Sequence, residues 1–314
     1  MTTSPPITIG LPVYNGEKYL GESIRCLRDQ TFGEFRLIIS DNASTDSTEE
    51  IARSAALEDE RVTYHRQQVN LGGPANYNFT LGQAEGDFFM WHAHDDLRDP
   101  RFLELAYGFM VTSPMTSVTF SRATAIGPDG EDLGALIRPD DLVHESAHRR
   151  LRAIIDAPRP ELVLFGLMRR ELLEQTGKHG TFKGGDRILV AEMAMLGDFH
   201  ELSEVLFHNR DHPDRYTRIS GGPEAERKRR EWWDPTRADG VISMPRWRGF
   251  REYLGAIRRH PLSSSERMRC YAALFRGLFD NRMYFAKLLT RETLGVFPHA
   301  ISKISDKRKR ASNS

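Results

Sequence analysis

The chain has 314 residues, enough to bury a sizeable core in one large or two ordinary domains. Lys and Arg together number 44, as do Asp and Glu, and this charge balance argues against a general nucleic-acid-binding protein. Two cysteines are too few for a disulfide framework and favour a reduced, cytoplasmic setting. The chain starts without a signal-peptide pattern, and no apolar run approaches the ~20 residues that span a bilayer, so we expect a soluble protein.

Short apolar segments alternate with helical patterns through the first hundred residues. Strands are expected at residues 7–13, 35–40, 62–65 and 87–91. Helices are expected between them, and the second of these should open with a capping box formed by Asp46 and Glu49. The third should run through Leu81, with Gly86 available to end it. Strands that alternate with helices predict an α/β protein with a mostly parallel sheet.

Three polar segments follow predicted strands, namely residues 12–15, 41–46 and 94–96. In a parallel sheet, ligands bind in the crevice beyond the carboxyl ends of the strands. For each segment alone, a turn or a helix cap is the better explanation. Their shared position favours one binding cleft.

The last of these segments ends in two adjacent acids, Asp95 and Asp96. Neighbouring residues at a strand end point in different directions, so two acids can serve two ligands. One carboxylate can bind a divalent cation that also holds a diphosphate, while the other accepts hydrogen bonds from hydroxyl groups. The alternative is that both acids cap a helix that starts near Pro100.

Four blocks together resemble the family 2 glycosyltransferases: "TIGLPVYNGEKYLGESIRCLRDQTF", "IISDNASTD", "NLGGPANYN" and "AEGDFFMWHAHDDL". They cover roughly the first hundred residues in the family's order and spacing. The resemblance implies a GT-A (Rossmann-like) fold, in which helices flank a mostly parallel sheet. It also implies an inverting transfer of sugar from a nucleotide-sugar donor, assisted by Mn²⁺ or Mg²⁺.

The resemblance also suggests which residues bind the nucleotide. The segment Pro12, Val13, Tyr14 and Asn15 resembles the one that lies along the base. Asp41 resembles the residue that hydrogen-bonds the base, usually uracil, and thymine presents the same edge. The block that borders the nucleotide and the sugar contains Asn70, Gly72 and Asn76.

At the acidic pair, Asp95 resembles the family's ribose-binding acid and Asp96 its metal-binding acid. Two positions depart from the family pattern. Many relatives have an acid where this chain has Ala93, and a second acid where it has Asn42. His94 either contacts the nucleotide in place of the missing acid or is a packed, hydrogen-bonded histidine.

The second half contains a candidate catalytic base. Further strands are expected at residues 118–120 and 162–166, and "FGLMRRELLEQTG" resembles the family segment that precedes the catalytic acid. Asp186 follows two glycines at the start of a helix that runs through Leu196. A carboxylate there would take the acceptor's proton during inversion. A helix N-cap is compatible with the same position.

A histidine in the next loop is a candidate metal ligand. After a strand at residues 205–207, His212 stands where some relatives place a histidine near the diphosphate and metal. A nitrogen ligand would favour Mn²⁺ over Mg²⁺, whereas an exposed loop histidine is the alternative. His208 and His212 would share a zinc ion only on a helix, so no zinc site is expected.

The chain is expected to divide into a catalytic domain, residues 1–219, and a helical C-terminal extension, residues 220–314. The donor-binding half of the domain is residues 1–100, and residues 101–219 form the acceptor and catalytic half. Trp232 and Trp233 in the extension either pack against a core or form a lid or acceptor wall.

Further along the extension, six apolar residues are expected to share one broad face of an amphipathic helix: Met268, Tyr271, Leu274, Phe275, Leu278 and Phe279. A basic tail follows. The alternative partners of this face are the catalytic domain, a second copy in a homodimer, and the inner surface of a membrane.

The leading hypothesis is therefore a metal-dependent inverting glycosyltransferase with a UDP- or dTDP-linked donor. Its acceptor would be a saccharide, a lipid-linked sugar or a small molecule. The second hypothesis, which Ala93 favours, is an inactive nucleotide-sugar-binding scaffold protein. A third, nucleotidyl transfer, needs a glycine-rich basic loop after the first strand, and "LPVYNGEKYL" matches it poorly.

Overall fold

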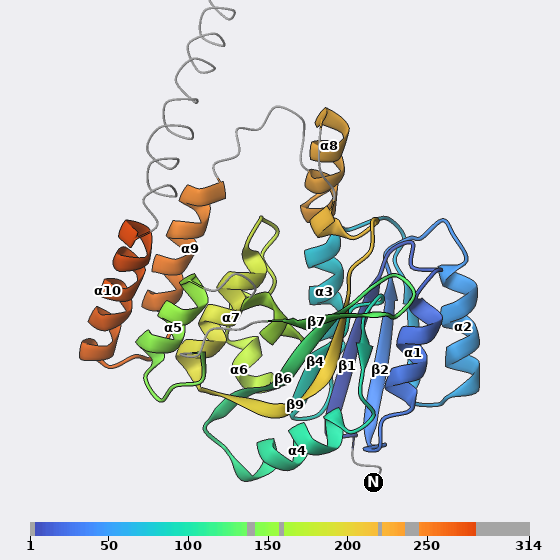
Figure 1. The fold of residues 1–314 in the computed structure, drawn as a ribbon, viewed down its shortest axis with the longest axis horizontal. Helices are drawn as coiled ribbons and strands as arrows, with labels where there is room; N and C mark the ends of the chain where they lie inside the picture. The colour runs from blue at the N-terminus through green and yellow to red at the C-terminus, as the bar shows by residue number, and fades with distance from the viewer. Residues whose placement is uncertain (1–3, 137–141, 157–159, 219–221, 236–244, 281–314) are drawn as a thin grey trace, which may run out of the picture.

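The computed structural model describes residues 4–136, 142–156, 160–218, 222–235 and 245–280. These residues form a central sheet of nine strands with helices packed around it (Figure 1). The expected α/β architecture is confirmed.

The first four strands form a parallel half-sheet in the order β3-β2-β1-β4. Their bounds are Ile7–Val13 for β1, Phe35–Asp41 for β2, Val62–Arg66 for β3 and Phe88–Trp91 for β4. All seven residues of β1 are buried because helices cover both faces of the sheet. Parallel pairing brings the carboxyl ends of β1, β2 and β4 together at one edge.

Four helices accompany these strands: α1 (Leu20–Arg28), α2 (Thr48–Glu58), α3 (Gly73–Gly82) and α4 (Phe102–Thr112). Two sequence signals that were expected at helix ends have other roles in the structure. Asp46 accepts hydrogen bonds from the backbone and hydroxyl groups of Thr48, but Glu49 pairs with arginines and does not complete a capping box. α3 ends at Gly82, and Gly86 (φ 76°) lies in the turn before β4, where a side chain would collide with the carbonyl oxygen of Pro5.

The rest of the sheet is mixed. Its strands are β5 (Leu97–Arg98), β6 (Thr116–Ile126), β7 (Asp132–Leu136), β8 (Leu167–Arg169) and β9 (Asp198–Arg210). β6 and β9 pair in parallel, whereas β8 joins β4 to β6 by antiparallel pairing. β9 also pairs with β5, directly after the acidic pair, so its C-terminal end lies beside that pair.

The prediction of a strand at residues 162–166 is wrong. The segment Pro160–Phe165 is a 3₁₀ helix, η2, and the strand β8 begins only at Leu167. Val163 and Leu164 are buried in the core, as a strand would also require. A short apolar run does not distinguish a buried strand from a buried helical turn, which explains the error.

The second half and the C-terminal region are largely helical. The helices are α5 (Ala147–Asp156), α6 (Arg170–Glu174), α7 (Gly185–Leu196), η3 (Tyr216–Arg218), α8 (Gly222–Trp233), α9 (Pro245–Arg259) and α10 (Ser264–Asp280). In Figure 1, α9 and α10 lie beside α5 and α7, on the opposite side of the molecule from α1 and α2. Residues of α5, α7, α9 and α10 belong to one continuous hydrophobic core.

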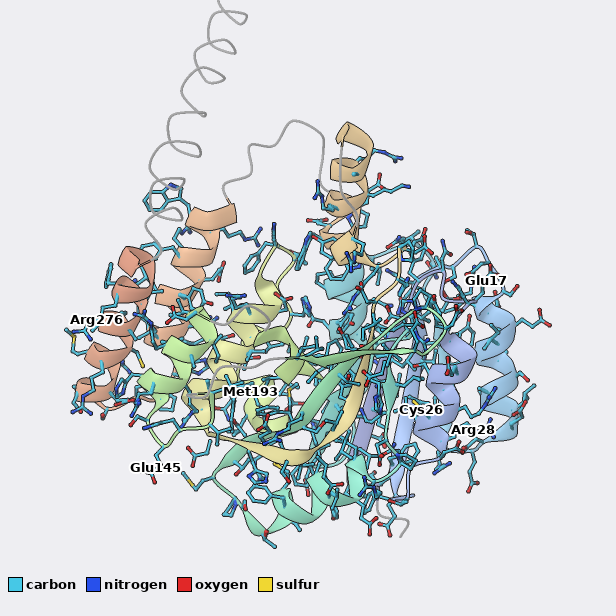
Figure 2. The ribbon with its side chains drawn as sticks, viewed as in Figure 1. Glu17, Cys26, Arg28, Glu145, Met193 and Arg276 are labelled. Carbon is cyan, nitrogen blue, oxygen red and sulfur yellow. The ribbon has the colours of Figure 1, made fainter. Side chains whose placement is uncertain are left out.

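α10 buries only part of the expected face, from which Tyr271 packs against the core. Cys270 and Leu274 are buried in the shared core, whereas Met268 and Phe275 are 66% and 54% exposed. Figure 2 shows Arg276 on the outer side of the same helix. Leu278, Phe279 and the basic tail lie outside the residues whose side chains are described. Among the described helices, none combines the length and apolar character needed to cross a bilayer.

Candidate active site

The acidic pair lies directly after β4 and is held by the end of β9. Asp96 is fully buried, and its Oδ1 accepts hydrogen bonds from the Arg210 backbone N–H (2.8 Å) and the Asn209 amide (3.1 Å). The Arg210 guanidinium, also buried, donates to the backbone carbonyl of Asp95 and pairs with Glu22 of α1. β9 therefore fixes both the side chain of Asp96 and the backbone beside it. Neither acid caps α4, which excludes the capping alternative for this pair.

Asp95 is paired with His212 across the site. Nε2 of His212 lies 2.9 Å from Oδ2 of Asp95, and both side chains are largely buried. A carboxylate accepts hydrogen bonds, so the contact assigns the proton to Nε2. Nδ1 of His212 is buried and has no hydrogen-bond partner. His212 is thus not an exposed loop histidine, and its free nitrogen remains available to a ligand.

The two acids have opposite pKa shifts. Burial is the largest cause that raises the pKa of Asp96, to about 7, and the charge of Asp95 adds to it. Burial also acts to raise the pKa of Asp95, but the hydrogen bond with His212 and the charges of His94 and Arg215 outweigh it and lower that pKa. The surroundings therefore stabilise a negative charge at Asp95 but disfavour a second one at Asp96.

Asp41 ends β2 and is completely buried. Its carboxylate accepts hydrogen bonds from the backbone N–H of Ser44 (2.9 Å) and the hydroxyl of Tyr64 (2.9 Å), and it forms an ion pair with Arg66 (2.7 Å). These contacts hold the loop after β2 against the end of β3.

The loop after β1 is tied to the loop after β2. The backbone N–H of Asn15 donates to Ser44, and the Asn15 side chain accepts from the backbone N–H of Thr45. Asn15 has a positive φ of 50°, a conformation that asparagine tolerates better than most residues. Pro12 and Val13 are buried, whereas Tyr14 is 44% exposed.

The block at residues 70–76 is fixed by amide side chains. Asn42 donates to Asn70 (2.8 Å) and accepts from the backbone N–H of Leu71, so its amide holds the turn. Asn70 in turn accepts from the backbone N–H of Gly72. Asn76 is buried and hydrogen-bonded to Ser40 of β2.

His94 is half-buried and packs closely on the loop after β1. A Cβ atom at Gly16 would lie 2.7 Å from the His94 ring, so only glycine fits there. The ring therefore lies between the acidic pair and that loop. Both alternatives for His94, packing and contact with a nucleotide, are compatible with this position.

Asp186 is the second residue of α7 and is half-buried. The N-cap position belongs to Gly184, so Asp186 does not serve as the cap. Tyr77 of α3 connects it with the acidic pair: burial is the largest cause that raises the Tyr77 pKa, and the charges of Asp95, Asp96 and Asp186 contribute in the same direction. The Tyr77 ring also contacts Trp91, at the end of β4, and His179, in the segment before α7, so it packs between the parts of the chain that carry the two sets of acids.

Aromatic side chains close one side of this region. Trp232 at the end of α8 stacks on Tyr216 with ring centroids 4.4 Å apart, and Trp233 donates a hydrogen bond to the Tyr216 hydroxyl. Trp232 also covers the start of α3, where a Cβ atom at Gly73 would lie 2.7 Å from its ring. Both tryptophans contact the ring of His179. They pack here, which is one of the two expected alternatives.

The residues present are compatible with a divalent cation bound together with a diphosphate. Within the part of the chain that the structure describes, no three His, Cys, Asp or Glu side chains already form a metal site. However, the unpartnered Nδ1 of His212 and the buried Asp96 carboxylate, whose negative charge is disfavoured beside Asp95, are features that a cation would satisfy. Metal-binding histidines commonly donate their other N–H to a carboxylate, as His212 does to Asp95.

Several residues of this site could not be identified from the sequence: Tyr77, His179, Asn209, Arg210, Arg215 and Tyr216. Arg215 donates to Asn209 and to the backbone carbonyl of Arg210, and its charge acts on both acids. The only available signal was its place three residues after His212. The others take their positions from strand pairing and helix packing, which short motifs do not report.

The parallel half-sheet, the acids at its carboxyl edge and the acid that begins α7 define a class, the glycosyltransferases of the GT-A fold. The family model described as Glycosyl transferase family 2 matches residues 8–190, more than half of the chain. The chain belongs to this family, as the resemblance implied.

Relatives and solved structures agree with this assignment. The putative glycosyltransferase EpsE of Bacillus subtilis is 34% identical over 111 residues, which cover 35% of this chain and 40% of that protein. A β-1,3-glucosyltransferase of Campylobacter jejuni, which acts on an undecaprenol-linked saccharide by its name, is 30% identical over 93 residues, 29% of this chain and 30% of that protein. The matches thus span less than half of either relative.

Two glycosyltransferases with solved structures share the fold. TarS of S. aureus in complex with UDP-GlcNAc has a TM-score of 0.61 at 17% identity, over 88% of this chain and 73% of that chain. The mannosyltransferase PcManGT of Pyrobaculum calidifontis, in complex with GDP-Man and Mn²⁺, has a TM-score of 0.54 at 18% identity, over 96% and 81%. The expected GT-A fold is confirmed.

Proposed function

We propose that the protein transfers a sugar, with inversion at the anomeric carbon, from a UDP- or dTDP-linked donor to an acceptor. The observation that carries the proposal is the acidic pair at the carboxyl edge of the sheet: Asp96 is held by β9, and Asp95 is paired with His212, whose Nδ1 is buried without a partner. The other half of the chain supplies Asp186 at the start of α7, and Tyr77 of α3 packs against both Trp91, before the acidic pair, and His179, before Asp186. The named ligands of the two structural relatives support a nucleotide-sugar donor.

In this proposal the carboxyl edge of the parallel half-sheet binds the nucleotide. The base lies along Pro12–Asn15 and is read by Asp41. A carboxylate offers about four lone-pair positions, and Asp41 already accepts from Ser44, Tyr64 and Arg66, which leaves about one for the base. His94 and the block that contains Asn70, Gly72 and Asn76 border the nucleotide and sugar. Asn76 acts there by holding the backbone of β2.

The acidic pair and His212 would hold the ribose and the metal. Oδ2 of Asp95 is engaged by His212, so Oδ1 is the oxygen proposed to accept from the ribose hydroxyls. Asp96 and Nδ1 of His212 are the proposed ligands of Mn²⁺ or Mg²⁺. When bound, such an ion would neutralise charge on the diphosphate and favour its departure. A nitrogen ligand makes Mn²⁺ the preferred ion.

Asp186 is proposed to act as the general base. The acceptor hydroxyl oxygen forms a bond to the anomeric carbon while its proton moves to the Asp186 carboxylate. The bond between the anomeric carbon and the diphosphate breaks, and its electron pair leaves with the nucleoside diphosphate. The acceptor is a saccharide, a lipid-linked sugar or a small molecule; the glucosyltransferase of C. jejuni, with an undecaprenol-linked acceptor in its name, favours the second class.

Calorimetric titration of UDP, dTDP, GDP and CDP, each with Mn²⁺ and with a chelator, tests the donor site. Tight binding of UDP or dTDP only with metal is the expected result. Binding that the chelator leaves unchanged would contradict the role of Asp96. If no nucleotide binds, the donor site is refuted; nucleotide binding without any transfer would favour the inactive nucleotide-sugar-binding scaffold.

We also propose that residues 220–314 bring the enzyme to the inner face of a membrane, as an addition to the catalytic domain of residues 1–219. Residues 245–314 contain 16 Lys and Arg but only 5 Asp and Glu, a net charge of +11 in a chain whose total is zero. Anionic lipid attracts each basic residue by about 1 kcal/mol, and Met268 and Phe275 are exposed beside Arg276. A second subunit is the competing partner of this face.

Flotation with vesicles of phosphatidylglycerol and phosphatidylcholine tests this placement. The full chain should float, and floating should weaken when Met268 and Phe275 are changed to Ser. Met115 is equally exposed at 72% but lies outside this region, so Met115→Ser is the matched control and should float normally. Dimerisation in light scattering without flotation would favour the second subunit.

A further inference from the structure

Glu192 of α7 is a buried carboxylate that the proposed reaction does not use. Its side chain is 1% exposed, and each of its oxygens is engaged. Oε2 accepts from the backbone N–H of Gly177 at 2.7 Å, and Oε1 contacts Arg259 at 3.0 Å and His260 at 3.1 Å. A buried charge is costly unless it is paired and hydrogen-bonded in this way.

These partners come from two separate parts of the chain. Gly177 belongs to the segment of residues 176–184, which joins α6 to α7 and is here called the base loop. Arg259 and His260 stand at the end of α9, more than sixty residues later. Glu192 therefore fastens the base loop to the C-terminal helices.

α9 contacts the base loop at a second point. The guanidinium of Arg248 lies over the ring of Phe182, 4.4 Å from its centroid. On its other side, the base loop is bonded to α3: the Asn78 side chain accepts from the backbone N–H of His179 and donates to its carbonyl, both at 2.9 Å. The loop is thus held from both directions.

The base loop in turn determines where α7 begins. A Cβ atom at Gly185 would lie 2.4 Å from the carbonyl oxygen of Gly180, so loop and helix start are in direct contact. Gly185 donates its backbone N–H to Phe182, and Gly184 has a φ of 89°, a conformation that favours glycine. Asp186 is the next residue, so a shift of the loop moves its carboxylate.

We propose that Glu192 is a positioning residue, which uses Arg259 and His260 of α9 to hold the base loop and so fixes the carboxylate of Asp186 relative to the acceptor. The inference rests on the proposed role of Asp186. It gives α9 a part in catalysis although α9 lies outside the residues that the family model matches. A misplacement of about 1 Å in a reacting group can cost on the order of 10²-fold in rate.

Glu192→Gln is the first test, because glutamine keeps the shape and removes the charge that holds Arg259 and His260. We expect kcat to fall by about tenfold or more, with the KM for the donor and the calorimetric Kd of the nucleotide within about twofold of wild type. Unchanged kcat would overturn the proposal. So would a loss of nucleotide binding that matches the loss of kcat, because that pattern indicates general damage.

Asp198→Asn is the matched control. Asp198 follows the C-terminal end of α7, opposite the base loop, and forms an ion pair with Arg150 at 2.8 Å. This variant should lose stability without losing kcat. A second comparison uses His260: His260→Gln keeps an N–H donor and should keep most of kcat, whereas His260→Ala should resemble Glu192→Gln. All variants are assayed well below their melting temperatures.

These outcomes can be distinguished from an error in the assignment of Asp186 as the general base. If Asp186→Asn remains active, the base assignment is wrong whatever Glu192→Gln does. If Asp186→Asn is inactive but both Glu192→Gln and His260→Ala are fully active, only the positioning role is refuted.

Discussion

The Nε2 atom of His212 lies 2.9 Å from Oδ2 of Asp95, and the opposite ring nitrogen, Nδ1, is buried without a partner. One ring nitrogen is thus held by a carboxylate, while the other has no hydrogen-bond partner. A histidine held in this way is ready to donate a lone pair.

His212→Ala should weaken Mn²⁺-dependent nucleotide binding on the order of tenfold, which is about 1.4 kcal/mol. The reason is the loss of the Nδ1 lone pair proposed as a metal ligand. Calorimetry with UDP at fixed Mn²⁺ measures the change. His208→Ala is the control, because His208 lies on β9 four residues earlier and should leave the affinity unaltered. Equal Mn²⁺ dependence in both variants would remove His212 from the metal site.

Asp186→Asn should lower kcat by 10²–10⁴-fold, the usual contribution of a general base. The amide cannot take the acceptor's proton, but it preserves the start of α7. Donor and metal binding should therefore stay at the wild-type level. Transfer is measured by release of the nucleoside diphosphate in the presence of acceptor, and a fully active variant would exclude Asp186 as the base.

Gly73→Ala should displace α8 from the start of α3. The added Cβ atom would lie 2.7 Å from the Trp232 ring, which must move to admit it. The expected signs are a red shift of tryptophan fluorescence and a lower melting temperature. Gly82→Ala, in the same helix, meets nothing within 4 Å and should be neutral or stabilising by up to about 1 kcal/mol. If both variants behave alike, the packing of Trp232 on Gly73 is not formed in solution.

Leu274→Ala should lower the free energy of unfolding by about 2–4 kcal/mol, because it leaves a cavity in the shared core. Met268→Ala on the exposed face of α10 should change it by less than about 0.5 kcal/mol. Denaturant titration compares the two. Similar losses at both positions would mean that α10 packs through the broad face expected from sequence, or not at all.

Stability should fall as the pH drops below about 6.5, in part because of His179. Burial is the largest cause that lowers the His179 pKa in the folded protein, against an opposing effect of the Asp186 charge. In the unfolded chain, His179 has a pKa of about 6.5, so below this pH the unfolded chain binds a proton that the folded chain does not bind. The free energy of unfolding therefore falls by up to about 1.4 kcal/mol per pH unit.

In His179→Gln this contribution is absent, so the variant should lose less stability between pH 7.5 and 5.5 than wild type. Thermal melts at both pH values measure the difference. Parallel losses in the two proteins would show that His179 protonates normally when folded.

Local patterns predicted the donor half well. Each strand from β1 to β4 appears as an apolar run that ends at a turn signal, and Asp41, Asp95 and Asp96 stand at the strand ends as expected. The second half was less predictable, because the arrangement of its strands depends on pairing between segments that are far apart in the sequence. Val163 and Leu164 are buried in η2 and not in a strand.

The partners of the acids show the same limit. Asn209 and Arg210 lie more than a hundred residues from Asp96 in the sequence. They reach it only because β9 pairs with β5 and β6. Glu192 looks in the sequence like one polar residue in an apolar helix, and only the packing of α9 shows what it holds. Long-range contacts of this kind produce no periodic pattern in the sequence.

α3 makes contact with three regions that the reaction would use. Gly73 lies under Trp232, Asn76 holds Ser40 of β2, and Asn78 holds the base loop at His179. These residues occupy less than two turns of one rigid helix. The effects of substitutions at Gly73, Asn76 and Asn78 should therefore not add, and a double variant should deviate from the sum of its single variants by 0.5–3 kcal/mol, the range found for coupled neighbours. A substitution in α3 that changes the preference for the donor should therefore also change the rate of transfer to the acceptor.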